Sequence, residues 1–130
     1  MTQEDKELLL KDLCYRLPYG VIVEIEDEPQ TPVQFEWQHL NFIINWGWTI
    51  KPYLRPMSSM TEEEYKSVSW EGCSHTYNYS LKSGFQFVEI KTFTLSILNW
   101  LNTHHFDYRG LIEKGLALEA SEGIYNINKK

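Results

Sequence analysis

The residues best suited to chemistry form a short run late in the chain: His104, His105 and Asp107. Imidazoles titrate near neutral pH and bind metals, and a nearby carboxylate can orient a proton transfer. Neighbouring residues of a helix point about 100° apart, so the two imidazoles do not converge on a regular helix. The pattern is more typical of helix-end histidines near the negative end of the helix dipole. A hydrolytic site built from these three residues stays a hypothesis, and we predict no metal and no cofactor.

Arg109 ends the same polar stretch and is a candidate for binding. With Asp107 it can present a guanidinium and a carboxylate at a binding surface. The alternative is a turn in which Asp107 accepts hydrogen bonds from nearby backbone N–H groups and Arg109 pairs with an acid. We favour the turn.

A second candidate is the segment 51–56, in which Tyr53 stands between Lys51 and Arg55. Alternate residues of an extended chain share one face, so these three side chains form a strip that can receive a phosphate or an acidic peptide. The same composition, with Pro52 inside it, is typical of an edge strand protected by charge and proline. We favour the edge strand.

Five tryptophans suggest a stacking site for a base or a nucleotide. Trp37 and Trp46 alternate with aliphatic residues, so they are predicted to lie in the core. Trp48 and Trp70 stand beside glycines and charged or polar residues, and we predict them to be exposed. The corresponding hypothesis is a pocket for an anionic, ring-bearing ligand, lined by Trp48, Trp70, Lys51, Tyr53 and Arg55.

The two cysteines lack the spacing of a metal site. Cys14 falls on the apolar stripe of the first expected helix, and we predict it to be buried and inert. Cys73 precedes His75 by two residues, which is a nucleophile pattern without a third, orienting group.

Length and charge favour one globular domain and argue against nucleic acid as a partner. A chain of 130 residues fits a single core, and a net charge of -6 with scattered Lys and Arg offers no basic face to phosphates. No apolar run approaches the roughly 18 residues that a membrane helix needs, and the first residues lack a signal pattern. We therefore predict a cytoplasmic protein with free thiols, one domain over residues 1–130 and a loose tail from about residue 123.

Hydrophobic periodicity predicts three helices. The first covers residues 2–17 and is capped by Thr2, and a short one lies within residues 58–68, where Thr61 and Glu64 have capping-box spacing. The third covers residues 92–104, and its broad apolar stripe indicates burial on more than one side. That stripe consists of Phe93, Leu95, Ile97, Leu98, Trp100 and Leu101.

Alternating patterns predict short strands over residues 20–26, 33–37, 40–46, 48–54, 85–90 and 116–119. We expect an α+β fold: a small antiparallel sheet of four to six short strands, curled towards a barrel. The helices over residues 2–17 and 92–104 should cover its apolar face.

Three strings of the sequence are distinctive: LLLKDLCYRLPYGV (residues 8–21), KPYLRPMSSMTEEE (51–64) and NWLNTHHFDYRGLIEKGLALEA (99–120). Together they resemble a family of short uncharacterised proteins of gut bacteria and their phages and mobile elements, whose members share the LRPMSSMTEEE and WLN-HHFDYRGLI boxes. The resemblance implies a bacterial or phage intracellular setting and no particular activity.

The chain has no P-loop, GxGxxG, HExxH or GxSxG motif. We therefore expect a small non-enzymatic interaction or accessory protein with a protein partner. A homo-oligomer is left open, and the nucleotide-like ligand site and the hydrolase remain the two alternatives.

Overall fold

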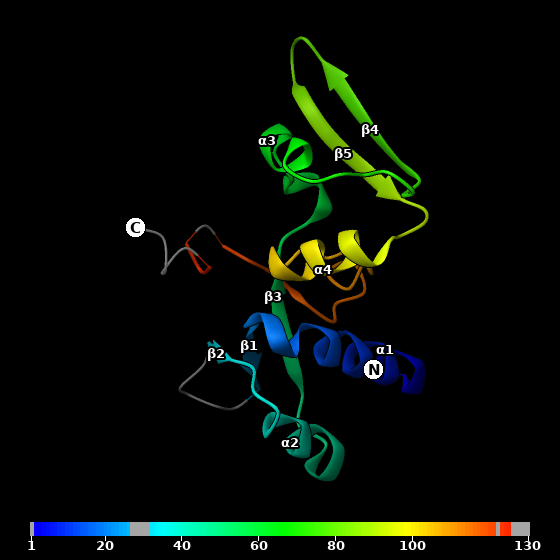
Figure 1. Cartoon of the computed structure of the whole chain (residues 1–130). Helices are drawn as coiled ribbons and strands as arrows, with labels where there is room; N and C mark the ends of the chain where they lie inside the picture. The colour runs from blue at the N-terminus through cyan, green and yellow to red at the C-terminus, as the bar shows by residue number, and fades with distance from the viewer. Residues whose placement is uncertain (1, 27–31, 122, 126–130) are drawn as a thin grey trace. The chain divides into compact units, whose positions relative to one another are not determined.

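The computed structural model describes residues 2–26, 32–121 and 123–125. The chain forms two compact units: unit 1 comprises Met1–Leu54 and Arg109–Lys130, and unit 2 comprises Arg55–Tyr108 (Figure 1). Helices and small sheets occur in both units, which confirms the predicted α+β class. The single domain over residues 1–130 stays a prediction.

Unit 1 combines two α-helices, a short 3-10 helix and a four-stranded sheet in the order β2-β1-β3-β6. The β1–β2 and β1–β3 pairs are antiparallel, whereas β3 and β6 run parallel. The sheet does not close into the predicted barrel. Its elements are α1 (Gln3–Arg16), η1 (Leu17–Tyr19), β1 (Ile22–Ile25), β2 (Val33–Gln34), α2 (His39–Trp46), β3 (Ile50–Leu54) and β6 (Leu118–Glu119).

Helix α1 begins as its sequence predicts. The Thr2 side chain accepts a hydrogen bond from the Asp5 backbone N–H, and the Asp5 side chain accepts one from the Thr2 N–H in return. Leu9 and Leu13 are buried in the core of unit 1 together with residues of the sheet and of the C-terminal segment. Cys14 is exposed, so the prediction that it is buried is wrong: the buried face of the helix consists of Leu9, Asp12, Leu13 and Arg16, and Cys14 lies off that face.

Strand β1 shows the predicted alternation: Val21, Val23 and Ile25 are buried, and Glu24 is exposed. The prediction that Pro52 marks an edge strand is wrong, because β3 lies inside the sheet.

The register explains how the sheet accommodates Pro52. Glu26 N–H donates to Thr49 C=O, so by antiparallel alternation Val23 and Pro52 face each other as a non-hydrogen-bonded pair. The proline nitrogen therefore points towards the β6 side, where pairing starts only at Tyr53. No ladder hydrogen bond is lost.

Residues 40–46 are predicted as a strand, but they belong to helix α2. The spacing of Leu40, Ile43 and Ile44 also suits a helix, and short apolar runs do not separate the two periods. Leu40 and Ile43 pack against the core of unit 1, and Gly47 ends the helix with a φ of 68°. The described residues thus contain four α-helices instead of three.

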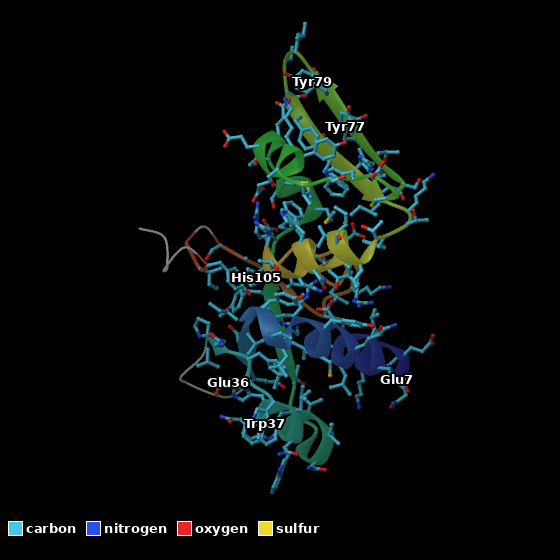
Figure 2. The ribbon with its side chains drawn as sticks, viewed as in Figure 1. Glu7, Glu36, Trp37, Tyr77, Tyr79 and His105 are labelled. Carbon is cyan, nitrogen blue, oxygen red and sulfur yellow. The ribbon has the colours of Figure 1, made fainter. Side chains whose placement is uncertain are left out.

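Unit 2 combines two α-helices with a β-hairpin, from which Tyr77 and Tyr79 project (Figure 2). Strands β4 and β5 pair antiparallel, with an irregularity between Thr76 and Tyr77. The predicted capping box of Thr61 and Glu64 opens α3. The elements are η2 (Met57–Ser59), α3 (Glu62–Lys66), β4 (His75–Ser80), β5 (Gly84–Ile90) and α4 (Leu95–Thr103).

Helix α4 confirms the predicted helix within residues 92–104, but its partner differs. Ile97 and Leu101 are buried with Phe87 of β5 in the core of unit 2, rather than on a sheet built mainly from residues 20–54. The helix begins after its N-cap Thr94, so Phe93 precedes it, and both Phe93 and Leu95 are exposed. The buried stripe is narrower than predicted.

The predicted loose tail from about residue 123 falls partly outside the described residues. Tyr125 is anchored to the sheet. Its hydroxyl accepts a hydrogen bond from the Ile22 N–H at 2.8 Å and donates one to the Tyr53 C=O at 2.7 Å. Burial raises the pKa of this hydroxyl far above the usual value for tyrosine.

Candidate functional site

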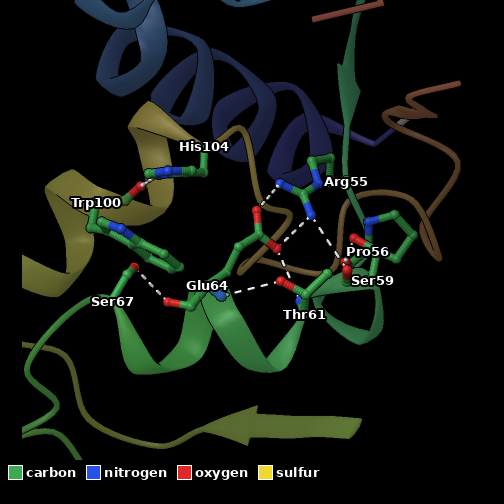
Figure 3. A network of polar contacts seen from close by, with 8 residues as sticks. All are labelled: Arg55, Pro56, Ser59, Thr61, Glu64, Ser67, Trp100 and His104. Carbon is green, nitrogen blue, oxygen red and sulfur yellow. Dashed lines mark hydrogen bonds and ion pairs between the residues drawn. The ribbon is translucent and has the colours of Figure 1, made fainter. Parts of the chain in front are cut away.

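The histidines of the predicted hydrolytic site are parts of the end of α4. The His104 Nδ1 donates to the Trp100 C=O at 2.9 Å, and the two rings lie 4.5 Å apart (Figure 3). His105 has a φ of 63°, the left-handed conformation that follows many helix ends. Its N–H donates to Asn102 C=O and the Phe106 N–H donates to Leu101 C=O, which together form a Schellman motif.

Asp107 is buried, and its backbone N–H donates to the Arg55 C=O at 2.8 Å. In residues 2–26, 32–121 and 123–125, no group of three His, Cys, Asp or Glu residues is placed to hold a metal ion. His104 and His105 therefore have an assigned structural role at a helix end, and the hydrolase stays a prediction.

Arg109 pairs with an acid, as the turn interpretation predicts. Its Nε lies 3.0 Å from Asp12 Oδ1, and Arg16 Nε lies 2.7 Å from Asp12 Oδ2. Asp12 and Arg16 are completely buried. The Arg109 guanidinium also lies over the Tyr15 ring, 5.2 Å from its centroid. This cluster joins α1 to the segment that follows unit 2, and it belongs to the structure of unit 1.

The cationic strip of the sequence meets carboxylates. The Arg55 guanidinium binds Glu64 in a bidentate pair, at 2.7 and 2.8 Å (Figure 3). It also lies 4.2 Å from the centroid of the Phe106 ring. Tyr53 Oη donates to Glu24 at 2.8 Å, and Lys51 faces Glu24 across the β1–β3 ladder. Carboxylates at these positions repel an anionic ligand, so the predicted nucleotide-like pocket stays a prediction without structural support.

Glu64 is the titratable group that this pairing changes most clearly. Burial alone raises its pKa, but the hydrogen bonds and charge of Arg55 and the backbone N–H of Thr61 act more strongly together. The pKa of Glu64 therefore lies below its ordinary value, and the carboxylate is charged at neutral pH.

Cys73 is not prepared for nucleophilic chemistry. Its thiol donates to the Thr92 C=O at 2.9 Å, and burial raises its pKa, against the opposing effect of a backbone hydrogen bond from Thr94. A neutral thiol is a poor nucleophile. His75 directs its Nε2 to the Tyr65 hydroxyl, 2.6 Å away.

The tryptophans are placed differently from their prediction. Trp37 and Trp46 were expected in the core but are 68% and 71% exposed. The residues predicted as strands with buried tryptophans instead form helix α2 and the turn before it. Trp48 is exposed as predicted, and its ring contacts Phe42 at 4.6 Å. Trp70 is half-buried, and its indole N–H donates to the Tyr65 C=O.

An apolar groove of about 250 Å³ lies between α1 and α2 within unit 1. Its floor is formed by core residues Leu9 and Ile50, and its opposite wall by Ile43 and Ile44 of α2 and by Trp48, which follows the helix. Polar side chains from the first two turns of α1 line its rim; these are Gln3, Lys6 and Glu7.

Helix α2 also carries apolar side chains outside this groove. The helix has no fully buried residue, although Leu40 and Ile43 contact the core. Ile44 and Trp46 are exposed, and Trp37 lies beside the helix (Figure 2). Ile44 lines the groove, whereas residues two apart on a helix point about 200° apart, so Trp46 lies on another side of α2.

A simple sequence signal identifies this face. Residues 37–50 contain three tryptophans and no Asp, Glu, Lys or Arg, in a chain of which 23% of residues are charged. The alternation of apolar residues assigns the segment to a buried strand, whereas the lack of charge together with Asn41 and Asn45 suits an exposed, neutral binding face.

Comparison of the chain with family models, with curated proteins and with solved structures finds no match. The resemblance to short proteins of gut bacteria and phages stays a prediction. Among the described residues, no helix is long and apolar enough to cross a membrane.

Proposed function

We propose that this protein is a non-enzymatic interaction module, and that the α1–α2 groove binds an amphipathic helix of a partner protein. The observation that carries the proposal is α2 itself: an uncharged, apolar helix without a fully buried residue, beside a groove of about 250 Å³. A bacterial or phage protein of the cytoplasm is the proposed setting, supported only by the sequence resemblance.

The size and lining of the groove favour a protein partner over a small ligand. Sites for drug-sized molecules usually enclose about 300–1,000 Å³ and bury most of the ligand. This groove is smaller and partly open, and it suits one or two apolar side chains projecting from a larger surface. A helix inserts such side chains at i, i+3 or i+4, and i+7.

The rim supports a helix rather than a bilayer. Lys6 and Glu7 stand next to each other on α1, so both signs of charge border an apolar floor. A helix with apolar residues on one face and both charge signs at its edges complements this rim. A lipid surface is broad and attracts cationic faces, whereas residues 37–50 carry no Lys or Arg and the chain has a net charge of -6.

Selection from a displayed library of helical peptides of about four turns tests the proposal. We expect selected sequences to share apolar residues at helical spacing. Ile44→Asp should weaken their binding about tenfold or more, because it places a charge in the desolvated contact. Leu81→Asp is the matched control: Leu81 is almost fully exposed in the turn of the unit 2 hairpin, so binding should not change.

Three outcomes would overturn the proposal. Selected peptides without helical periodicity, or with unchanged binding to Ile44→Asp, would place the site elsewhere. Co-sedimentation with phosphatidylcholine vesicles that Ile44→Asp abolishes would make this face a membrane-binding surface. A concentration-dependent dimer, measured by light scattering and abolished by Ile44→Asp, would identify a second copy of the chain as the occupant.

A further inference from the structure

The β4–β5 hairpin of unit 2 is a two-stranded sheet with two open edges (Figure 1). Among the described residues, no third strand pairs with either β4 or β5. The side chains of β4 are mostly accessible to solvent, and Tyr77 and Tyr79 are 49% and 59% exposed. A sheet of two strands is only marginally stable in water, and added strands stabilise it. Each open edge is therefore a place where a further strand can pair.

The strand edges of the described residues differ in how they are protected against such pairing. In unit 1 the outer strands β2 and β6 have two residues each, which is too short for a long ladder. Strand β5 contains a bulge, because Val88 has no partner in the register between Thr76 and Tyr77. Strand β4 has six residues, and none of them is Pro, Asp, Glu, Lys or Arg. It thus has neither the shortness, the bulge nor the charges that keep an edge from pairing.

The register of the hairpin determines which backbone groups of β4 point outward. The C=O of Ser74, just before the strand, accepts from the Lys91 N–H at 2.7 Å and therefore points towards β5. The bulge lies in β5, so the groups of β4 alternate in direction without interruption, and those of Asn78 also point towards β5. The N–H and C=O groups of Tyr77 and Tyr79 point the other way. These two residues present the hydrogen-bonding groups of the open edge.

The open edge of β4 is complementary to a second copy of itself. When two β4 strands lie antiparallel about a two-fold axis at Asn78, Tyr77 of each copy faces Tyr79 of the other. Both residues present outward N–H and C=O groups, so each facing pair can exchange two backbone hydrogen bonds. The outward groups therefore match in the symmetric register, and no charge is opposed to a like charge.

The side chains of β4 match in the same register. Asn78 then faces Asn78 of the second copy, and a carboxamide carries both a donor and an acceptor, so the two can hydrogen-bond each other. On the opposite face, the Tyr77 ring of one copy lies across from the Tyr79 ring of the other, and aromatic cross-strand pairs stabilise antiparallel strands. The uncharged edge gives no preference to a basic or an acidic peptide, whereas its own strand matches it on both faces.

We propose that two copies of this protein associate through antiparallel pairing of their β4 strands, which joins the two hairpins into one four-stranded sheet. The outer strands of that sheet are then the two β5 strands, in which the bulge at Val88 and the charge of Glu89 oppose further addition. The assembly therefore closes as a dimer. The contact is small, so the dimer is weak and forms at high protein concentration. The site lies in unit 2 and does not depend on the function proposed for unit 1.

Sedimentation velocity of the full chain from micromolar to millimolar concentration tests the proposal. We expect a monomer–dimer equilibrium without larger species. Asn78→Lys should weaken dimerisation about tenfold or more, because it removes the amide pair and opposes two like charges. Gln86→Lys is the matched control: Gln86 is exposed and is the partner of Asn78 within the hairpin, so it shares that face but lies one strand away from the contact. It should leave the dissociation constant unchanged.

A charge exchange tests the position of the two-fold axis. A mixture of Asn78→Lys and Asn78→Glu chains should associate as a mixed dimer, because opposite charges then face each other. Circular dichroism shows whether each variant keeps its fold. If the variants unfold, hydrogen exchange of the unaltered protein provides the test. Exchange of the Tyr77 and Tyr79 N–H groups should slow in step with dimer formation as the concentration rises, whereas the Asn78 N–H, which points into the hairpin, should not change.

Several results would overturn the proposal. They are a monomer at all concentrations, a dissociation constant that a folded Asn78→Lys variant leaves unchanged, equal weakening by Gln86→Lys, and mixed chains that stay monomeric. A dimer abolished by Ile44→Asp but retained by Asn78→Lys would place the contact in the α1–α2 groove instead. Higher oligomers or fibres would show that the edge pairs without closing.

Discussion

Each unit contains one prominent ion-pair cluster, and the two clusters differ in burial. In unit 1, Asp12 binds Arg16 with both side chains fully buried, and Arg109 completes the group. In unit 2, the Arg55 and Glu64 side chains are 26% and 23% exposed. Buried charges have lost their hydration, so each depends on its partners, whereas a partly hydrated pair tolerates the loss of one member better. Burial therefore predicts which cluster a mutation will damage more.

The largest expected effect is that of Asp12→Ala. The substitution leaves Arg16 buried without its carboxylate, which should lower the free energy of unfolding by about 3–5 kcal/mol. Urea titration followed by circular dichroism measures the change. Lys11 is exposed and directly precedes Asp12 in α1, so Lys11→Ala should change the free energy of unfolding by less than about 0.5 kcal/mol. A loss below about 1 kcal/mol for Asp12→Ala would show that burial does not separate the two clusters.

Arg55→Ala should have an intermediate effect, a loss of about 1–2 kcal/mol, between the values typical of exposed and buried pairs. It removes both hydrogen bonds to Glu64 and the contact with the Phe106 ring. Arg55→Lys retains the charge but not the bidentate geometry and should lie between Arg55→Ala and the wild type. If the lysine variant is as stable as the wild type, the bidentate geometry of the guanidinium does not contribute to stability.

Lowering the pH should reveal how much the Arg55–Glu64 pair of unit 2 contributes to stability, because Glu64 loses its charge in acid. Its pKa is lower in the folded protein than the ordinary 4.5, so the unfolded chain binds more protons at pH values between the two. The stability that Glu64 contributes is present above about pH 4.5 and is lost as the pH falls through the folded-state pKa. Urea titrations at about pH 6 and about pH 3.5 should show a smaller pH effect in Glu64→Gln than in the wild type. An equal effect in both would contradict the assignment.

The smallest effect is expected for Lys66→Ala. Its salt bridge with Glu62 at i, i+4 is exposed, with 69% and 40% of the two side chains accessible, so its loss should cost less than about 0.5 kcal/mol. Thermal unfolding at low and high salt measures this term. A larger loss would mean that Lys66 contributes more than a surface ion pair, for example by packing its methylene groups in the groove between α3 and the β4–β5 hairpin.

Local signals in the sequence predict local structure well. The N-cap at Thr2, the capping box at Thr61 and the alternation in β1 each involve residues close together in the chain, and all are present in the structure. Partners far apart in the chain leave no such signal: Arg109 reaches Asp12 across 97 positions, and Arg55 reaches Glu64 across nine. Sequence could show that Arg109 needs an acid, but not which one.

Hydrophobic periodicity does not locate the α1–α2 groove because it assigns one wall of the groove to a strand instead of a helix. Leu40, Ile43 and Ile44 satisfy a strand period and a helical period over too few residues to separate them. Once α2 is a helix, Ile44 and Trp46 reach solvent instead of a core. The pairing of Tyr77 with Phe87 and of Tyr79 with Phe85, and the contact of Tyr65 with Phe85, join residues that no local pattern links, so they require the fold.

The parallel pairing of β6 with β3 affects the order in which a growing chain can fold. Ribosomes release the N-terminal part first, and unit 2 is continuous, so it is complete before the last strand of unit 1 leaves the exit tunnel. Until then Leu54 lacks its partner Glu119, and Tyr125 has not yet bridged Ile22 and Tyr53. The nascent polypeptide therefore carries an open strand edge until residues 118–119 emerge, and an open edge is a template for pairing with other chains.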